Sequence, residues 1–154
     1  MAIAPYRVFF DTSVYIAALL SPKGAAGELV RLAEVGVIRM IVSQEVIIEA
    51  DRVLSVKFPE LIGESRKLWK YLSPEIASNP AAGQMKPFLE KLSKGDALIL
   101  SAAHLAKVSV FVTWNTRDFM NPSVSLRKTL VDFPIVVPAD CLKLFRIWIE
   151  AFLD

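Results

Sequence analysis

The 154 residues are the length of one domain, which can bury roughly 70% of the surface of its unfolded chain without disulfides or metals. The net charge of +2 permits nucleic-acid binding without indicating it. Although 54% of the residues are hydrophobic, the longest apolar stretch, residues 14–20, is too short for a membrane span, which needs ~20 residues. A lone cysteine, Cys141, excludes a disulfide framework or a Cys/His zinc site and favours a reducing, cytoplasmic compartment.

Short apolar runs alternate with helical patterns along the chain. Runs of β-branched and aromatic residues predict strands, whereas apolar residues at i, i+3, i+4 and i+7 predict helices. The first predicted strand has no charged and apolar leader before it, so we expect no signal peptide. In chain order we predict a strand at 6–10, helices at 12–20 and 25–35, a strand at 39–42, a helix that Ser43 caps and Pro59 ends, helices at 60–72, 84–93 and 94–107, strands at 108–113 and 135–137, and a helix at 139–153.

This order, βαα-βααα-αβ-αβα, predicts an α/β fold. Strands that are separated by helices require crossover connections, which build a mostly parallel sheet covered by helices on both faces. Residues 60–93 form a helical excursion whose most loop-like stretch is 79–83, and we do not interpret it as a domain boundary. Ligands of such sheets bind beyond the carboxyl ends of the strands, where the strand order reverses.

Acidic and amide side chains follow two of the predicted strands. Asp11 comes directly after the first strand, and Asn115 and Asp118 come after the third. Glu49 lies at the border of the apolar face of its helix, and Asp96 lies in a first helical turn, where the helix dipole favours a carboxylate. Oxygen ligands of this kind suit hard cations such as Mg²⁺, commonly together with substrate phosphates. The sequence therefore predicts a metal site for phosphodiester chemistry.

Each of these residues also has a purely structural interpretation. Asp11 and Asp96 suit helix starts, the latter with a serine three residues before it. Glu49 can pair with Arg52 on a solvated helix face, which is worth only ~0.2 to 0.5 kcal/mol. Residues 115–118 suit a turn. Capping and metal binding do not exclude one another.

Several other functions lack the residues that they need. A haloacid-dehalogenase-type phosphatase requires a second Asp two residues after the first, where this chain has Ser13, and a response receiver requires an acidic pair at the first strand. A dinucleotide-binding enzyme requires Gly-x-Gly-x-x-Gly after that strand, and no glycine follows it there. We interpret the isolated His104 as structural and Cys141 as a small core residue.

Four segments, in this order, resemble the PIN domain family, and most closely the VapC-like toxins of prokaryotic toxin–antitoxin pairs. The segments are Phe10-Asp-Thr-Ser-Val-Tyr-Ile16, Ser43-Gln-Glu-Val-Ile-Ile-Glu49, Gly95-Asp-Ala-Leu-Ile-Leu-Ser-Ala-Ala103 and Val112-Thr-Trp-Asn-Thr-Arg-Asp-Phe119. Together they extend over nearly the whole chain. The resemblance implies a three-layer α/β/α sandwich over residues 1–154, with a central, mostly parallel sheet of four to five strands.

The resemblance also implies a metal-dependent endoribonuclease that holds one or two Mg²⁺ or Mn²⁺ ions. Carried over by position, the acidic triad is Asp11, Glu49 and Asp96. Asn115 stands where many relatives have an Asp, so Asp118 is a candidate for the missing charge, and either Asn115 or Asp118 is the fourth ligand. Supporting polar side chains, able to hydrogen-bond carboxylates or water, are Ser13 and Thr113. Trp114 also departs from the family pattern, which commonly has a small or basic residue there.

The expected partners are RNA, a cognate antitoxin and a second copy of the chain. Basic residues flank the acidic segments, and of these Lys94 and Arg117 are candidate RNA contacts, whose phosphate binding would be salt-sensitive. The last helix is apolar on more than one stripe, which predicts burial by the core on one side and by a partner on another. An alternative function is a catalytically weak or inactive PIN-like module that binds RNA or acts as a scaffold, favoured by Asn115 and the modest basic charge.

Overall fold

A five-stranded parallel sheet lies at the centre of the computed structural model, which describes residues 5–120 and 130–153. The strand order is β3-β2-β1-β4-β5, and every neighbouring pair is parallel. The strands are β1 (Tyr6–Phe10), β2 (Ile38–Ser43), β3 (Glu75–Ala77), β4 (Val110–Val112) and β5 (Ile135–Val136). The predicted parallel α/β sheet is therefore confirmed.

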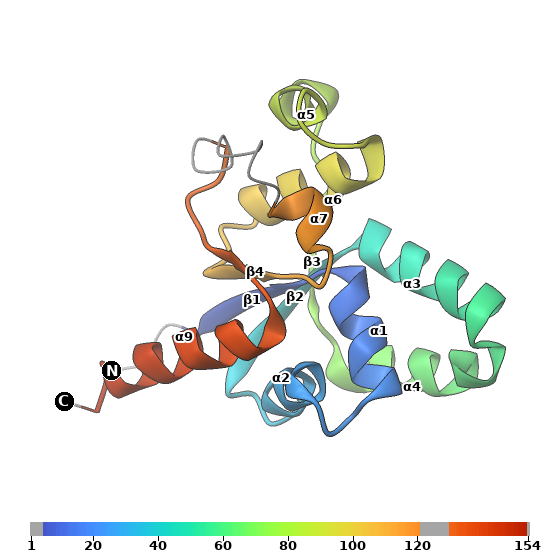
Figure 1. Ribbon diagram of the computed structural model, residues 1–154, viewed down its shortest axis with the longest axis vertical. Coiled ribbons are helices and arrows are strands. Elements are labelled where there is room, and N and C mark those ends of the chain that lie inside the picture. The colour runs from blue at the N-terminus through green and yellow to red at the C-terminus, as the bar shows by residue number, and fades with distance from the viewer. Residues whose placement is uncertain (1–4, 121–129, 154) are drawn as a thin grey trace.

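Helices cover both faces of this sheet, as the alternation of elements predicts. The described helical segments are α1 (Thr12–Leu20), α2 (Ala25–Glu34), α3 (Gln44–Lys57), the 3₁₀ turn η1 (Pro59–Leu61), α4 (Ile62–Leu72), α5 (Ala82–Leu89), α6 (Lys94–Leu105), α7 (Thr116–Phe119) and α9 (Pro138–Glu150). Figure 1 shows α1, α2, α4 and α9 on one side of the sheet and α5, α6 and α7 on the other. This is the three-layer sandwich. In the described ranges, no helix is both long and apolar enough to cross a membrane.

Three short elements differ from the prediction. β3 lies in a stretch that we did not interpret as a strand, because three residues are too few to show an alternating pattern, and pairing with β2 stabilises it. α5 begins at Ala82 and ends at Leu89, whereas we expected a helix at 84–93. Residues 116–119 form the one-turn helix α7. The long, periodic helices agree with the prediction to within about two residues, except that α9 ends at Glu150, three residues before the predicted end.

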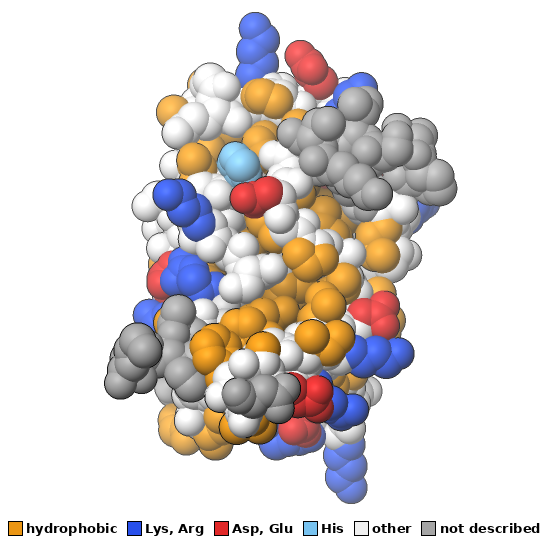
Figure 2. All heavy atoms as spheres, turned by 90° about the vertical axis from the view of Figure 1, so that its left-hand side faces the viewer, with side chains coloured by type: hydrophobic (Ala, Val, Ile, Leu, Met, Phe, Trp, Pro, Cys, Tyr) orange, Lys and Arg blue, Asp and Glu red, His pale blue; other side chains and the backbone are white. Residues whose placement is uncertain are grey.

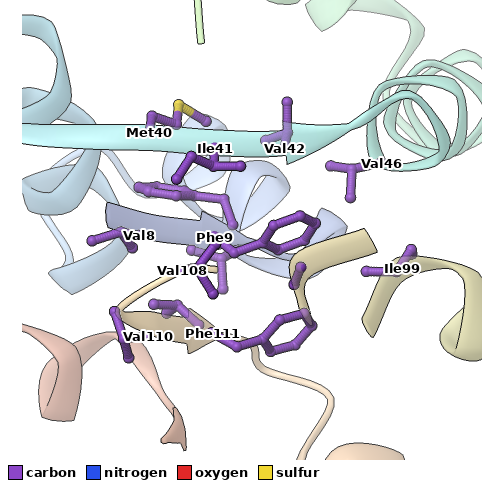
Figure 3. Packing of buried hydrophobic residues seen from close by; sticks show 14 of the residues in the cluster. Val8, Phe9, Met40, Ile41, Val42, Val46, Ile99, Val108, Val110 and Phe111 are labelled. Carbon is purple, nitrogen blue, oxygen red and sulfur yellow. The ribbon is translucent and has the colours of Figure 1, made fainter. Parts of the chain in front are cut away.

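The central strands pack their side chains into one apolar cluster. Figure 3 shows residues of β1, β2 and β4 side by side in this core, together with Val46 of α3 and Ile99 of α6. Phe9 and Phe111 stack across the β1–β4 pair with their ring centroids 5.2 Å apart. Strands that are buried on both faces need apolar residues at every position, which explains their continuous apolar runs.

An ion pair joins β1 to the edge strand β3 across β2. The guanidinium of Arg7 donates to the two carboxylate oxygens of Glu75 at 2.9 and 2.6 Å, and also to the carbonyl oxygen of Ala106 at 2.7 Å. Hydrogen bonding from Arg7 lowers the pKa of Glu75 below its ordinary value, although burial opposes this. The side chains are 26% and 34% exposed, so solvent screens only part of the attraction.

We expect Glu75→Gln to lower the free energy of unfolding by about 1 kcal/mol at neutral pH, because it removes a partly screened charge-assisted pair. A carboxyl whose folded-state pKa is lowered stabilises the fold above its unfolded pKa and loses that contribution in acid. The difference between parent and variant should therefore shrink as the pH falls below 4.5, the ordinary pKa of a Glu. Urea unfolding of both proteins at neutral and acid pH measures this, and a difference that is independent of pH would contradict it.

Candidate active site

Asp11 lies at the point where the strand order reverses. β1 has β2 on one side and β4 on the other, although β4 follows much later in the chain. The backbone N–H of Asp11 donates to the carbonyl oxygen of Val112 at 3.0 Å, so the carboxyl ends of β1 and β4 meet at this residue. Open α/β sheets bind their ligands at such a reversal. Because β1 and β4 are neighbours, the segments that follow these two strands lie side by side.

The carboxylate of Asp11 faces β4 and does not cap its own helix. Although Asp11 occupies the N-cap position of α1, its side chain accepts no capping hydrogen bond. Instead, Oδ2 accepts from the hydroxyl of Thr113 at 2.7 Å and from that of Ser13 at 3.1 Å. The two hydroxyls that we predicted as supporting polar groups thus hold this carboxylate in place.

Burial dominates the electrostatics of Asp11. The side chain is almost fully buried, and this raises the pKa of its carboxyl above the ordinary value despite the hydrogen bonds from Thr113, Ser13 and the Thr12 backbone, which lower it. A buried carboxylate without a neighbouring positive charge is costly in its ionised form. Its environment therefore favours either protonation or a cation.

Glu49 approaches the same place from α3. Ser43 caps this helix by accepting from the N–H of Val46 at 3.4 Å, as we predicted. The pKa of Glu49 is raised, first by burial and then by the negative charge of Asp11, with a smaller contribution from Asp96. Among the ion pairs of residues 5–120 and 130–153, none joins Glu49 to Arg52. The surface-pair interpretation of Glu49 is therefore wrong.

Asp96 comes from the first turn of α6, on the other side of the sheet. Its N–H donates to the hydroxyl of Ser93 at 3.4 Å, so the predicted cap is present and the carboxylate lies at the same helix start. The pKa of Asp96 is raised by burial, then by Asp118 and by Asp11, while Ser93 lowers it. The start of α6 is therefore capped by Ser93 and also carries Asp96 within electrostatic range of the other acids.

Asn115 and Asp118 form the start of α7. Asn115 caps this short helix by accepting from the N–H of Asp118 at 3.3 Å, and its amide donates to Oδ2 of Asp118 at 3.0 Å. Asp118 is exposed and raises the pKa of Asp96, whereas Asn115 is half-buried. The turn interpretation is therefore corrected to a capped helical turn. Of these two residues, only Asp118 carries a negative charge, and this charge raises the pKa of Asp96.

The carboxylates converge without forming a tight cluster. Asp11 acts on Glu49 and on Asp96, and Asp118 acts on Asp96, so the acids lie within electrostatic range of one another. In the part of the chain that the structure describes, however, no three His, Cys, Asp or Glu side chains are close enough to hold a metal ion as they stand. The acids therefore act on one another electrostatically without sharing one position for a metal ion.

Thr12 provides an independent indication that this place suits a polar ligand. Its hydroxyl is the only buried side-chain N or O atom within the described ranges that has no hydrogen-bond partner, and the residue is 3% exposed. The hydroxyl lies near enough to Glu49 to lower its pKa, but without the geometry of a hydrogen bond. An unpaired buried hydroxyl costs about 1 to 3 kcal/mol. Oxygen-rich side chains around such an atom fit a hydrated divalent cation.

Sequence reasoning missed Thr12, because a threonine at the first position of a helix is ordinary. The candidate RNA contacts Lys94 and Arg117 are exposed and lie beside Asp96 and Asp118 in the chain. His104 lies on α6 with its ring centroid 5.9 Å from that of Phe88. Cys141 is buried in the core, and burial raises the pKa of its thiol to about 12, as suits a small apolar residue.

Comparison with known proteins agrees with this geometry. Residues 7–117 match the family model of the PIN domain, whereas no curated protein matches the sequence significantly. The fold is similar to that of VapBC2 from Rickettsia felis, solved bound to a DNA fragment from its promoter, with a TM-score of 0.60 and 17% identity over 83% of this chain and 96% of that chain. It is also similar to PAE2754 from Pyrobaculum aerophilum, with a TM-score of 0.59 and 18% identity over 92% and 98% of the two chains. The chain belongs to the PIN domain family.

Proposed function

We propose that this protein is a metal-dependent endoribonuclease and the toxin of a toxin–antitoxin pair. The observation that carries the proposal is the convergence of Asp11, Glu49 and Asp96 from three different elements at the reversal of the strand order, each with a raised pKa. Burial is the main cause of all three raised pKa values, and the neighbouring acids add to it at Glu49 and Asp96. Buried acids without a positive partner give a fold no benefit, whereas a site that binds a cation beside a phosphodiester uses them.

Different residues of the chain would have different roles in hydrolysis. Asp11, Glu49, Asp96 and Asp118, with Asn115 beside them, are the proposed ligands of one or two Mg²⁺ or Mn²⁺ ions. When bound, the metal would neutralise charge on the scissile phosphate and lower the pKa of the attacking water. Thr113 and Ser13 orient the Asp11 carboxylate by donating to its Oδ2. Glu49 or Asp96 would orient the water or accept its proton.

A cleavage assay tests the proposal. We expect the purified protein to cut RNA in millimolar Mn²⁺ or Mg²⁺ and to leave it intact in EDTA. Lys94 and Arg117 are the proposed phosphate contacts, so cleavage should also weaken as the salt concentration rises. Intact RNA under all metal conditions would contradict the enzyme.

The alternative function is a PIN-like module that binds RNA without cutting it. Asn115 favours it, because an amide at this position supplies no negative charge. Measuring both the binding and the cleavage of RNA in the same samples distinguishes the two functions. RNA that is bound but never cut would support the module.

An antitoxin and a second copy of the chain are the proposed protein partners. VapBC2, a structural neighbour, was solved as a complex on promoter DNA, which supports an antitoxin partner here. On α9, Trp148 packs against Tyr6 with their ring centroids 5.1 Å apart, while Ile147 is 64% exposed. Figure 2 shows hydrophobic side chains in a band across the face on the side of α9. We propose that a second copy of the chain covers this apolar band.

We also propose a cytoplasmic location, which the lone cysteine indicates.

We expect Ile147→Glu to convert a dimer into a monomer, because the new carboxylate would have to be desolvated in an apolar interface. Size-exclusion chromatography with light scattering at micromolar concentration measures the mass. Val56→Glu is the matched control, since Val56 is 77% exposed on α3 and outside this face. A monomeric parent, or a dimer that persists in Ile147→Glu, would contradict the interface.

A further inference from the structure

Trp114 lies beside the candidate active site through its backbone. It is the second residue after β4, and its N–H donates to the hydroxyl of Ser13 at 2.9 Å. That hydroxyl donates to Oδ2 of Asp11 at 3.1 Å. The next residue is held as well, because the N–H of Asn115 donates to Thr113 Oγ1 at 2.8 Å. The backbone of Trp114 is therefore two hydrogen bonds away from the carboxylate of Asp11.

The indole of Trp114, in contrast, is exposed to solvent. It is 49% exposed, whereas Trp69 stacks on Tyr15 with their ring centroids 3.8 Å apart and Trp148 packs against Tyr6. Within the described ranges, Trp114 stacks on no other aromatic ring. A single exposed apolar side chain is ordinary. What distinguishes Trp114 is that the loop carrying its free ring is fixed to the acidic site on both sides.

We propose that Trp114 stacks on an unpaired base of the RNA, next to the phosphate that is cut. This inference rests on the proposed function and adds to it a base contact by Trp114, a residue that departs from the family pattern. The carboxylates repel the phosphate backbone until a cation is bound, so a flat apolar ring on the loop that is bonded to them offers a contact that does not depend on charge. Every base has a face that can stack on an aromatic ring, whereas bases inside a duplex already stack on each other.

The fixed backbone is what makes this contact useful for cleavage. A ring on a free loop would lose conformational entropy on binding, whereas this loop is already ordered by the bonds to Ser13 and Thr113. Because the same hydroxyls also hold Asp11, a base stacked on Trp114 is placed in register with the acidic site. Trp114 thus selects unpaired substrate and positions it.

RNA binding in EDTA tests the role of Trp114 without cleavage. The probes are a short unstructured oligoribonucleotide and the same oligonucleotide with abasic sites. We expect RNA to quench tryptophan emission in the parent and not in Trp114→Phe, which should keep most of the affinity. Trp114→Ala should bind RNA on the order of 5- to 100-fold more weakly. Abasic RNA should bind the parent and Trp114→Ala equally.

A matched control is Tyr71→Ala. Tyr71 is a 71% exposed aromatic residue at the end of α4, and the adjacent Leu72 lines a cavity with Pro5 and Ile38, at the amino ends of β1 and β2. This is the opposite edge of the sheet from Asp11, so we expect parent-like binding of RNA. The urea midpoint of Trp114→Ala should stay close to that of the parent, because Trp114 is 49% exposed and is not a buried core residue. If Trp114→Ala does not fold, two measurements still test the stacking role: the quenching in the parent against that in Trp114→Phe, and the parent's affinity for intact against abasic RNA.

The outcomes separate this inference from the nuclease itself. Equal affinity of the parent and Trp114→Ala for intact RNA would overturn the stacking role, as would parent binding that does not distinguish intact from abasic RNA. A parent that binds no RNA would overturn it too. Conversely, quenching that depends on Trp114, together with RNA that stays intact in Mn²⁺, would support the stacking role and reject the nuclease.

Discussion

Cleavage of RNA in Mn²⁺ is expected to fall at least about 100-fold in Asp11→Asn, because loss of even an outer-sphere partner of a metal site commonly costs 10- to 100-fold. Asp11 is the most buried of the acids and lies where β1 and β4 meet, so its charge is screened least by solvent. An amide keeps the shape of the side chain and can still accept from Thr113 and Ser13, but it does not attract a divalent cation. Initial rates on one labelled RNA measure the effect.

The same substitution should leave the fold intact and make the metal-free protein no less stable. Burial raises the pKa of Asp11, so the ionised carboxylate destabilises the folded state at neutral pH, and this cost disappears as the pH falls below the raised pKa. An amide never carries that charge. The urea midpoint of Asp11→Asn in EDTA should therefore equal or exceed that of the parent at neutral pH, with the difference shrinking in acid.

Asp140→Asn is the matched control for the loss of one carboxylate. Asp140 is exposed on α9, 3.8 Å from Lys143, and it is not among the charges that act on Asp11, Glu49 or Asp96. Its substitution should leave cleavage unchanged. Equal activity of Asp11→Asn and the parent would reject Asp11 as a metal ligand, whereas a large loss of stability in Asp11→Asn would show that its charge serves the fold.

Millimolar Mn²⁺ is expected to raise the melting temperature of the parent. A ligand that binds only the folded state adds RT ln(1 + [L]/Kd) to its stability, about 2.7 kcal/mol when its concentration is 100 times Kd. For a domain of this length that corresponds to a rise of about 5 to 10 °C. Burial and, to a smaller extent, the neighbouring acids raise the pKa of Glu49 and Asp96, and the cation would offset the second of these contributions.

Two comparisons make the thermal shift specific. Asp11→Asn should show a much smaller rise than the parent, since one of the proposed ligands is lost, and Asp140→Asn should show the parent's rise in full. No rise in the parent, or the same rise in Asp11→Asn, would contradict a metal site at these acids, whatever the result of the cleavage assay.

Local patterns predicted most of the fold. The strands at 6–10 and 39–42 and the helix capped by Ser43 lie close to where the pattern placed them, since burial on both faces and capping leave a signature within a few residues. β3 and α7 were missed because each is too short for a period to appear. The boundaries of α5 were misplaced, as a helix that contains Pro87 has a weak pattern.

The candidate site was predicted as a set of residues and not as an arrangement. Asp11, Asp96 and Asp118 could be named from their places after strands and at helix starts, and Glu49 from its place at the border of the apolar face of its helix. Their mutual electrostatics, the looseness of the cluster and the unpaired hydroxyl of Thr12 could not, because each depends on side chains from different elements.

What the amino-acid order alone determined is the alternation of strands and helices and the kind of chemistry that the acids can carry, since both follow from contacts among near neighbours in the chain. The tertiary structure decided which residues meet. Thr113 reaches Asp11 across 102 positions, and Arg7 reaches Glu75 over an intervening strand. Such contacts depend on strand order and register, which are set by how the whole core packs and leave no periodic trace in any single segment.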